Sequence, residues 1–116
     1  MIVDDTGLFR KQLRFILEKL DFEICCEAHN GQEAVNLYGN YKPDLILLDI
    51  QMPVMNGIET LQRLKEINSN LPIVMMTAFP SPEIIEECIE KGANDLLTKP
   101  IRSSDIQKSI ESALLF

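Results

Sequence analysis

The sequence predicts a single α/β domain in which a parallel β-sheet is covered by helices on both faces. Five short apolar segments alternate with five segments of helical periodicity along the whole chain. Segment 44–49 contains four consecutive apolar residues without polar alternation, which is typical of a strand buried on both faces of a parallel sheet. With 116 residues and no linker or repeat, the chain has room for one hydrophobic core but not two. We therefore expect one doubly wound (βα)5 domain over residues 1–116.

The first strand is predicted at Met1–Val3, an apolar run that ends at an acidic pair. Leucines and isoleucines then recur at helical spacing, which predicts a helix running to about Lys19. The segment Phe22–Ala28 is predicted as the second strand. It contains Cys25 and Cys26, and because neighbouring side chains of a strand point to opposite faces, we expect both to be small core residues.

The middle of the chain predicts two helices and the third and fourth strands. Asn30, followed three residues later by Glu33, resembles a capping box and starts the second helix, which Pro43 ends. The third strand is predicted at Asp44–Asp49 and the fourth at Leu71–Thr77. Between these strands, a helix turns four apolar residues to the core: Ile58, Leu61, Leu64 and Ile67.

The last third of the chain predicts two helices and one weaker strand. Ser81 and Pro82 form an N-cap and a first helical position, and Gly92 is placed to end that helix. A fifth strand is predicted at Asp95–Thr98, and a final helix begins near Ser103. The inner face of the fourth helix is expected to consist of Ile84, Ile85, Cys88 and Ile89.

The composition excludes several classes of partner. There are 11 basic against 18 acidic side chains, a net charge of −7, whereas nucleic acids and anionic membrane surfaces attract basic proteins. No apolar run approaches the roughly 20 residues of a membrane-spanning helix, and acidic residues follow Val3 too early for a signal peptide. We expect a soluble cytoplasmic protein that binds neither nucleic acid nor membrane.

Polar residues collect at the carboxyl ends of the predicted strands. In a parallel sheet these ends lie on one edge, which is where open α/β sheets bind ligands. Residues distant in sequence therefore converge on one small region. The set follows or ends the first, third, fourth and fifth strands and consists of Asp4, Asp5, Asp49, Thr77 and Lys99.

The chemistry of this set indicates a metal-dependent phosphoryl site. Thr6 is sufficient to cap the first helix, so the acidic pair before it needs another role. Three converging carboxylates repel one another, and a hard divalent cation such as Mg²⁺ relieves that repulsion. A metal beside a carboxylate, a lysine and a hydroxyl is suited to phosphoryl transfer, in which the carboxylate attacks and the other groups stabilise charge on the phosphoryl oxygens.

The strand-end residues belong to longer motifs, each weak alone but specific in this order and spacing: Asp4-Asp5, Asp49-Ile50-Gln51-Met52-Pro53 with Asn56-Gly57, Thr77-Ala78, Gly92-Ala93 and Lys99-Pro100. With these motifs the chain resembles the receiver domain of bacterial two-component response regulators over nearly its whole length. The resemblance implies a flavodoxin-like, chemotaxis-regulator-like fold with strand order 2-1-3-4-5. The chain stops at Phe116, just past the last predicted helix, so we expect a receiver domain with no output domain in this chain, either a stand-alone regulator or a piece of a larger protein.

The resemblance assigns roles to the site residues. It implies that Asp49 accepts a phosphoryl group from a kinase phosphohistidine and loses it slowly by autodephosphorylation, with no other enzymatic activity. Mg²⁺ (or Mn²⁺) would be bound by Asp49, directly by Asp5, mainly through water by Asp4, and by the backbone carbonyl of Gln51. The groups that contact the phosphoryl oxygens would be those of Thr77 and Lys99.

Partners are implied in the same way. The phosphoryl donor would be a sensor histidine kinase or a phosphotransfer protein, and the recipient of the signal a downstream protein or output domain. The output surface would be the fourth helix, fifth strand and last helix, from about Glu83 to Leu115. The chain would be a monomer or a phosphorylation-dependent homodimer, and Lys99-Pro100 is a candidate cis peptide bond.

Three positions depart from the family or tune its chemistry. Leu96 stands three residues before the lysine, where the family usually has an aromatic switch residue, so the output step is expected to differ. Gln51 and Phe79, two residues after Asp49 and Thr77, lie where the family tunes phosphoryl lifetime, and a bulky Phe79 would restrict access of water. Only three residues precede the acidic pair, fewer than in relatives. The remaining conspicuous side chains are interpreted as a surface histidine, His29, and packing methionines, Met52, Met55, Met75 and Met76.

Three alternatives stay open. A phosphatase of the haloacid dehalogenase type also uses a strand-end aspartate, but it needs a second acid two positions on, where this chain has Gln51. A flavodoxin-like binding module would need a Ser/Thr/Gly-rich phosphate loop in place of the acidic pair. A receiver fold that has lost phosphorylation is disfavoured because all five site residues are present.

Overall fold

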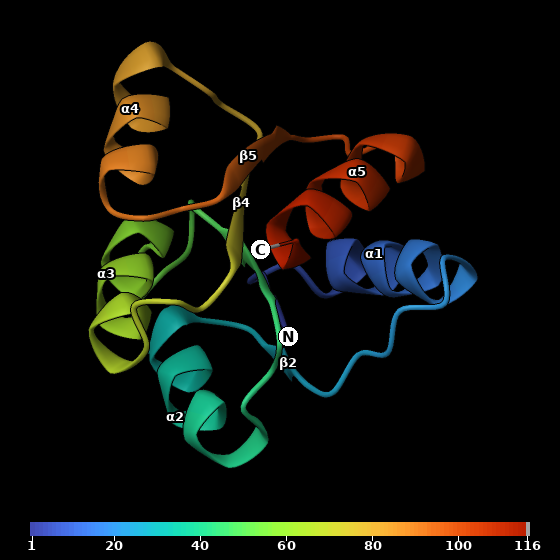
Figure 1. Cartoon of the computed structure of the whole chain (residues 1–116), viewed down its shortest axis with the longest axis horizontal. Coiled ribbons are helices and arrows are strands. Elements are labelled where there is room, and N and C mark those ends of the chain that lie inside the picture. The colour runs from blue at the N-terminus through green and yellow to red at the C-terminus, as the bar shows by residue number, and fades with distance from the viewer. Residues whose placement is uncertain (116) are drawn as a thin grey trace.

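The computed structural model describes residues 1–115 and confirms the predicted α/β architecture. Five parallel strands form one sheet in the order β2-β1-β3-β4-β5, and a helix follows each strand (Figure 1). The predicted domain end at Phe116 lies outside the described residues. The elements are β1 (Ile2–Val3), α1 (Gly7–Lys19), β2 (Glu27–Ala28), α2 (Gly31–Tyr41), β3 (Ile46–Asp49), α3 (Gly57–Ile67), β4 (Ile73–Thr77), α4 (Pro82–Glu90), β5 (Asp95–Thr98) and α5 (Ser103–Leu114).

Helices cover the two faces of the sheet unequally. α1 and α5 lie on one face, and α2, α3 and α4 lie on the other (Figure 1). Because successive strand residues point to opposite faces, the central strands supply both hydrophobic clusters. Ile46 and Leu48 join the cluster that includes residues of α2–α4, whereas Leu47 joins the cluster beneath α1 and α5. All residues of β3 and β4 are buried, which explains their nearly continuous apolar sequence.

The register of the sheet aligns the strand ends that carry the predicted site. β3 pairs with β4 through Asp49 opposite Met76, and β4 pairs with β5 through Thr77 opposite Thr98. β1 pairs with β3 through Val3 opposite Leu48, so the residue after Val3 meets the end of β3. The carboxyl ends of β1, β3, β4 and β5 therefore meet on one edge.

The second strand is shorter than predicted. β2 comprises Glu27–Ala28 alone, because its partner β1 offers only Ile2 and Val3 in register. The prediction of two core cysteines is wrong for Cys25, which is exposed, whereas Cys26 is half-buried against the core. Their sulfur atoms lie 3.5 Å apart, so the irregular backbone before β2 does not separate them to opposite faces as a strand would. Likewise β3 and β4 each begin two residues later than predicted.

Two of the predicted helix caps are confirmed and one is wrong. Asn30 accepts a hydrogen bond from the Glu33 amide (2.8 Å), and Ser81 accepts one from the Ile84 amide (3.2 Å). Thr6 occupies the N-cap position of α1, but its side chain makes no capping hydrogen bond. The nearby Asp4 carboxylate instead accepts the Thr6 amide. Gly92 ends α4 with a φ of +100°, a conformation that favours glycine.

Some apolar residues expected on inner helix faces are exposed. Ile84 and Cys88 form the buried stripe of α4, but Ile85 and Ile89 lie one residue further round the helix and face solvent. Ile67, at the last position of α3, is also exposed. The surface position of His29 is confirmed, and it pairs with Glu33 at 2.9 Å. The four methionines pack as predicted: Met55, Met75 and Met76 are buried, and Met52 is partly buried against the core.

No helix within residues 1–115 is long and apolar enough to cross a membrane.

Candidate functional site

The structure brings the five predicted site residues together at the carboxyl edge of the sheet. Asp4, Asp49 and Thr77 are buried, with exposed fractions of 0%, 2% and 0%. Asp5 is exposed beside them, and 18% of the Lys99 side chain is exposed. One carboxylate oxygen from each of Asp4, Asp5 and Asp49 lies within 4.8 Å of the other two. The site is thus a carboxylate cluster with one open side.

Lys99 is the cation of this cluster. Its Nζ donates a hydrogen bond to Asp4 Oδ2 at 2.7 Å and lies 3.4 Å from Asp49 Oδ1. The same Nζ sits 4.1 Å from the centroid of the Phe9 ring, a cation–π contact from α1. The adjoining Lys99-Pro100 peptide bond is cis, which confirms that prediction. The lysine therefore bridges the first and third strands from the loop that follows the fifth.

Asp49 is poorly stabilised as an anion. Its Oδ1 is buried and accepts no hydrogen bond from the described residues. Burial, and next the negative charge of Asp4, raise the pKa of Asp49 to about 6, although Lys99 acts in the opposite direction. An anion with these surroundings gains from any cation or electrophile that reaches it.

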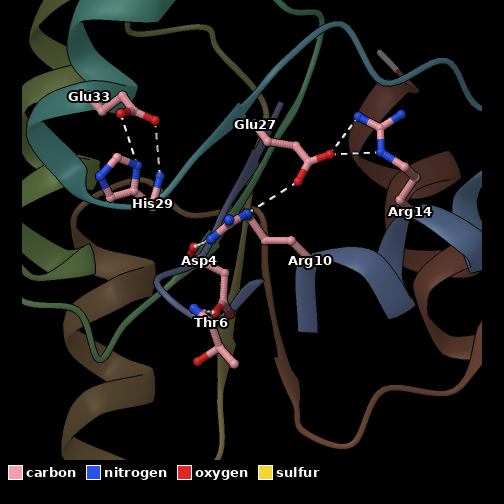
Figure 2. A network of polar contacts seen from close by, with 7 residues as sticks. All are labelled: Asp4, Thr6, Arg10, Arg14, Glu27, His29 and Glu33. Carbon is pink, nitrogen blue, oxygen red and sulfur yellow. Dashed lines mark hydrogen bonds and ion pairs between the residues drawn. The ribbon is translucent and has the colours of Figure 1, made fainter. Parts of the chain in front are cut away.

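Asp4 is held in place by a network that the sequence did not predict. Asp4 Oδ1 accepts the Thr6 amide at 2.8 Å, and Arg10 Nη1 donates to the Asp4 carbonyl oxygen at 2.6 Å. Arg10 Nε also donates to Glu27 at 3.2 Å, and Glu27 accepts from Arg14 Nε at 2.7 Å (Figure 2). A basic residue one helical turn after an acidic pair is the sequence signal that could have identified Arg10. This network fixes the loop between β1 and α1.

Thr77 is already hydrogen bonded on both sides. Its hydroxyl donates to Gln51 Oε1 at 2.9 Å and accepts the Phe79 amide at 3.1 Å. Gln51 is exposed, and the Phe79 ring is 74% exposed. The two predicted tuning positions are thus connected to each other through Thr77.

The loop after Asp49 is fitted closely to the strand end. The Gly57 amide donates to the Ile50 carbonyl oxygen at 2.8 Å. A Cβ atom at Gly57 would overlap the carbonyl oxygen of Asp49, so only glycine fits there without displacing the backbone. The predicted switch position, Leu96, is half-buried and packs against the core cluster on the α2–α4 face. Its aliphatic side chain has no ring or hydroxyl with which to follow a movement of Thr77.

The donor set fits a hard divalent cation. Three carboxylates converge, and Asp49 Oδ1 is a buried oxygen that no donor among residues 1–115 reaches. Oxygen-only ligation that leaves room for waters and a phosphate is the arrangement Mg²⁺ prefers. The site thus pairs an under-stabilised carboxylate with a lysine and a hydroxyl.

Comparison with known sequences identifies the family. Residues 1–111 match the family described as "Response regulator receiver domain". The chain belongs to the response regulator receiver family. A receiver domain is a regulatory phosphoacceptor domain of phosphorelay signalling in two-component systems, and phosphorylation and Mg²⁺ binding are general properties of the family.

Two relatives of this receiver domain are chemotaxis proteins. "Chemotaxis protein CheY" of Halobacterium salinarum is 39% identical over 114 residues, covering 98% of this chain and 94% of its own length. "Chemotaxis protein CheY" of Bacillus subtilis is 36% identical, covering 98% of this chain and 95% of its own length. Each of these two relatives is thus similar to the chain over nearly its whole length.

Solved structures agree with the fold. A crystal structure of the CheX–CheY–BeF3–Mg²⁺ complex from Borrelia burgdorferi contains a chain that matches with a TM-score of 0.95 at 33% identity. The match covers 99% of this chain and 87% of the other. A CheY-like receiver from Methanospirillum hungatei matches with a TM-score of 0.90 at 27% identity, covering 97% of this chain and 90% of the other. The predicted strand order and layers are thereby confirmed.

Proposed function

We propose that Asp49 is the phosphoacceptor of this receiver domain and that a phosphohistidine of a sensor kinase or phosphotransfer protein is the donor. The observation that carries the proposal is the state of Asp49: a buried carboxylate at the end of β3 with a raised pKa, no hydrogen bond on Oδ1 and Lys99 Nζ 3.4 Å away. At neutral pH the carboxyl group is still mostly ionised, so its oxygen can attack the phosphorus of the donor as a nucleophile.

The transfer is a displacement at phosphorus. An oxygen of the Asp49 carboxylate forms the new O–P bond while the P–N bond to the donor imidazole breaks, and the electron pair stays on the imidazole nitrogen. Lys99, released from Asp4, and the Thr77 hydroxyl, released from Gln51, stabilise the negative charge on the peripheral phosphoryl oxygens. Hydrolysis of the resulting acyl phosphate by water returns the carboxylate slowly, so the domain resets itself without acting on other substrates.

Asp4, Asp5, Asp49 and the backbone carbonyl of Gln51 would hold Mg²⁺, or Mn²⁺, in this proposal. The ion would offset the repulsion among the three carboxylates and neutralise charge on the phosphoryl group. Asp5 is exposed and free to turn toward a cation, whereas buried Asp4 is held by Thr6 and Lys99. This difference agrees with direct ligation by Asp5 and water-mediated ligation by Asp4.

Phosphorylation from a small donor tests the proposal. The full chain is incubated with acetyl phosphate and Mg²⁺, and its intact mass is followed with time. We expect one phosphate adduct in the wild type, none in Asp49→Asn, and a strongly reduced rate in Asp5→Asn. Asp21→Asn is a matched control, because Asp21 is an exposed carboxylate in the turn after α1, and it should label like the wild type.

If Asp49→Asn gained the same phosphate adduct as the wild type, the assignment of the acceptor would be refuted. Labelling that is equally fast with chelator and with Mg²⁺ would refute the metal requirement. Multiple turnovers on a generic phosphate ester would instead favour the phosphatase alternative. The phosphatase alternative needs a general acid two positions after Asp49. Gln51 stands there, and its amide, which accepts a hydrogen bond from the Thr77 hydroxyl, cannot serve as a general acid.

The output step is proposed to run through the α4–β5–α5 face. Exposed Ile85 and Ile89 lie on α4, and residues of β5 and α5 line a groove of about 500 Å³, with Leu96 and Ile101 in its lining. Because Leu96 offers no ring to follow Thr77, we infer that exchange of the Thr77–Gln51 hydrogen bond is the local event that reports phosphorylation. A downstream protein target, such as the CheX bound by the Borrelia relative, is the class of partner expected there.

A further inference from the structure

Cys25 and Cys26 carry neighbouring thiols that the phosphorylation site does not use. They lie just before β2, the edge strand of the sheet, and their Sγ atoms are 3.5 Å apart. Cys25 is exposed and Cys26 is half-buried. The pair can therefore be reached from solvent at a place remote in sequence from every phosphorylation-site residue.

The fold holds one member of this pair in place. The Cys26 carbonyl oxygen accepts a hydrogen bond from the Ile2 amide at 3.2 Å, and the Cys26 side chain packs against the hydrophobic core. The exposed thiol of Cys25 is attached to this fixed neighbour. The two sulfurs are thus presented together by the sheet edge, and little conformational entropy is lost when both bind one atom.

The geometry of the sulfurs restricts the ligand. If one atom were bonded to both sulfurs at about 2.3 Å, the length of a metal–thiolate bond, the bond angle between the two sulfurs at that atom would be about 100°. A structural zinc site needs four ligands. Within residues 1–115, however, the carboxylate cluster is the one group of three or more side chains placed to share a metal. The thiols therefore suit an atom that takes two sulfurs and carries its own third substituent.

We propose that Cys25 and Cys26 form a chelating site for trivalent organoarsenicals of the type RAs(OH)2. Arsenic stays in the +3 state throughout. Two As–O bonds break and two As–S bonds form, and each thiol proton leaves with an oxygen, so that two water molecules are released. The carbon substituent completes the three bonds of arsenic and points away from the sheet edge. The proposal is independent of phosphorylation at Asp49.

The protonation state of Cys26 disfavours ordinary alkylation. Burial, and next the hydrogen bond and charge of Cys25, raise the pKa of Cys26 to about 11. Alkylating reagents need the thiolate, so Cys26 is a poor nucleophile near neutral pH. In the condensation with RAs(OH)2 the two thiol protons leave in the released water, so the overall reaction is balanced with neutral thiols.

The test is a titration of the reduced full chain with phenylarsonous acid, followed by intact mass and by competition with 2,3-dimercaptopropanol. We expect one phenylarsenic group per chain, with loss of two thiol hydrogens, and removal by the dithiol competitor. Cys25→Ser should weaken binding roughly 100-fold, because a single thiol forms only one As–S bond and lacks the added affinity of chelation by two linked thiols. The exposed position of Cys25 makes this variant structurally mild.

Cys88→Ser is the matched control, since Cys88 is a buried single thiol on α4. It should bind the arsenical as tightly as the wild type does. Equal affinity in the wild type and Cys25→Ser would overturn the proposal, as would loss of binding in Cys88→Ser alone. Acetyl phosphate labelling of Cys25→Ser at the wild-type rate would show that the variant is folded and that the thiol site is separate from the phosphorylation site.

Discussion

Replacing Asp49 by asparagine should stabilise the folded domain at neutral pH. Burial and Asp4 raise the pKa of Asp49 from 3.8 to about 6, so the ionised carboxylate is less favourable in the folded than in the unfolded chain. Between these pKa values the folded state binds more protons, and the free energy of unfolding falls as pH rises through that window. Asparagine mimics the neutral carboxyl group. The pKa difference corresponds to about 3 kcal/mol gained at pH 7.5, and to roughly half of that at pH 5.

Urea unfolding at pH 5 and pH 7.5, in chelator, measures this gain directly. The control is Asp21→Asn, which removes the same charge from an exposed turn whose φ of 66° asparagine tolerates. Its effect should stay within about 0.5 kcal/mol at both pH values. The reasoning is refuted if Asp49→Asn is no more stable than the wild type at pH 7.5. It also fails if the gain is the same at both pH values, since a packing effect would not follow the titration.

Four further substitutions test two positions at the site, Phe9 and Gly57, and a control position in α2, Gly39. Phe9→Leu removes the aromatic face beneath Lys99 Nζ, worth about 0.5–1 kcal/mol, and should slow acetyl phosphate labelling about two- to fivefold, whereas Phe9→Tyr should label normally. Equal rates in both variants would mean that the ring does not position the lysine. Gly57→Ala should destabilise the domain by at least about 2 kcal/mol in urea unfolding, because its Cβ would overlap the Asp49 carbonyl oxygen. Gly39→Ala, in α2 with no atom near its added Cβ, should instead stabilise by about 0.5–1 kcal/mol, and losses at both glycines would contradict this packing argument.

The positions of the site residues could be predicted because they follow from topology. Strand periodicity locates Asp49 and Thr77 at strand ends, and the rules for parallel sheets place those ends on one edge. The pairing of Lys99 Nζ with Asp4 and Phe9 could not be predicted, since it depends on side-chain rotamers and on the path of the loop after β5. The same limit applies to Gln51. It is expected to contribute its backbone carbonyl to the metal and to tune phosphoryl lifetime, but the hydrogen bond that its side chain accepts from the Thr77 hydroxyl could not be predicted.

Element boundaries were less predictable than element types. The apolar pattern from Phe22 onward is typical of a strand, but a strand extends only as far as its neighbour can pair. Because β1 pairs only with Glu27 and Ala28, residues 22–26 remain outside the strand. Helix α4 shows a similar effect, because four apolar residues cannot all face one sheet and the second stripe, Ile85 and Ile89, remains exposed. In both cases the tertiary partner, which a local pattern does not contain, decides the outcome.

The Lys99–Asp4 ion pair joins residues 95 positions apart in the chain. During synthesis Asp4, Asp49 and Thr77 leave the ribosome well before Lys99, and until then the carboxylates face one another without their internal cation. Non-local contacts of this kind are closed late, after the loop entropy of the intervening chain has been overcome. Asp49, the proposed acceptor, is thus balanced by Lys99 only once the fifth strand has docked, so a nascent or truncated chain that lacks β5 carries the acidic residues without a finished site. Docking of β5 therefore completes both the sheet and the proposed phosphorylation site.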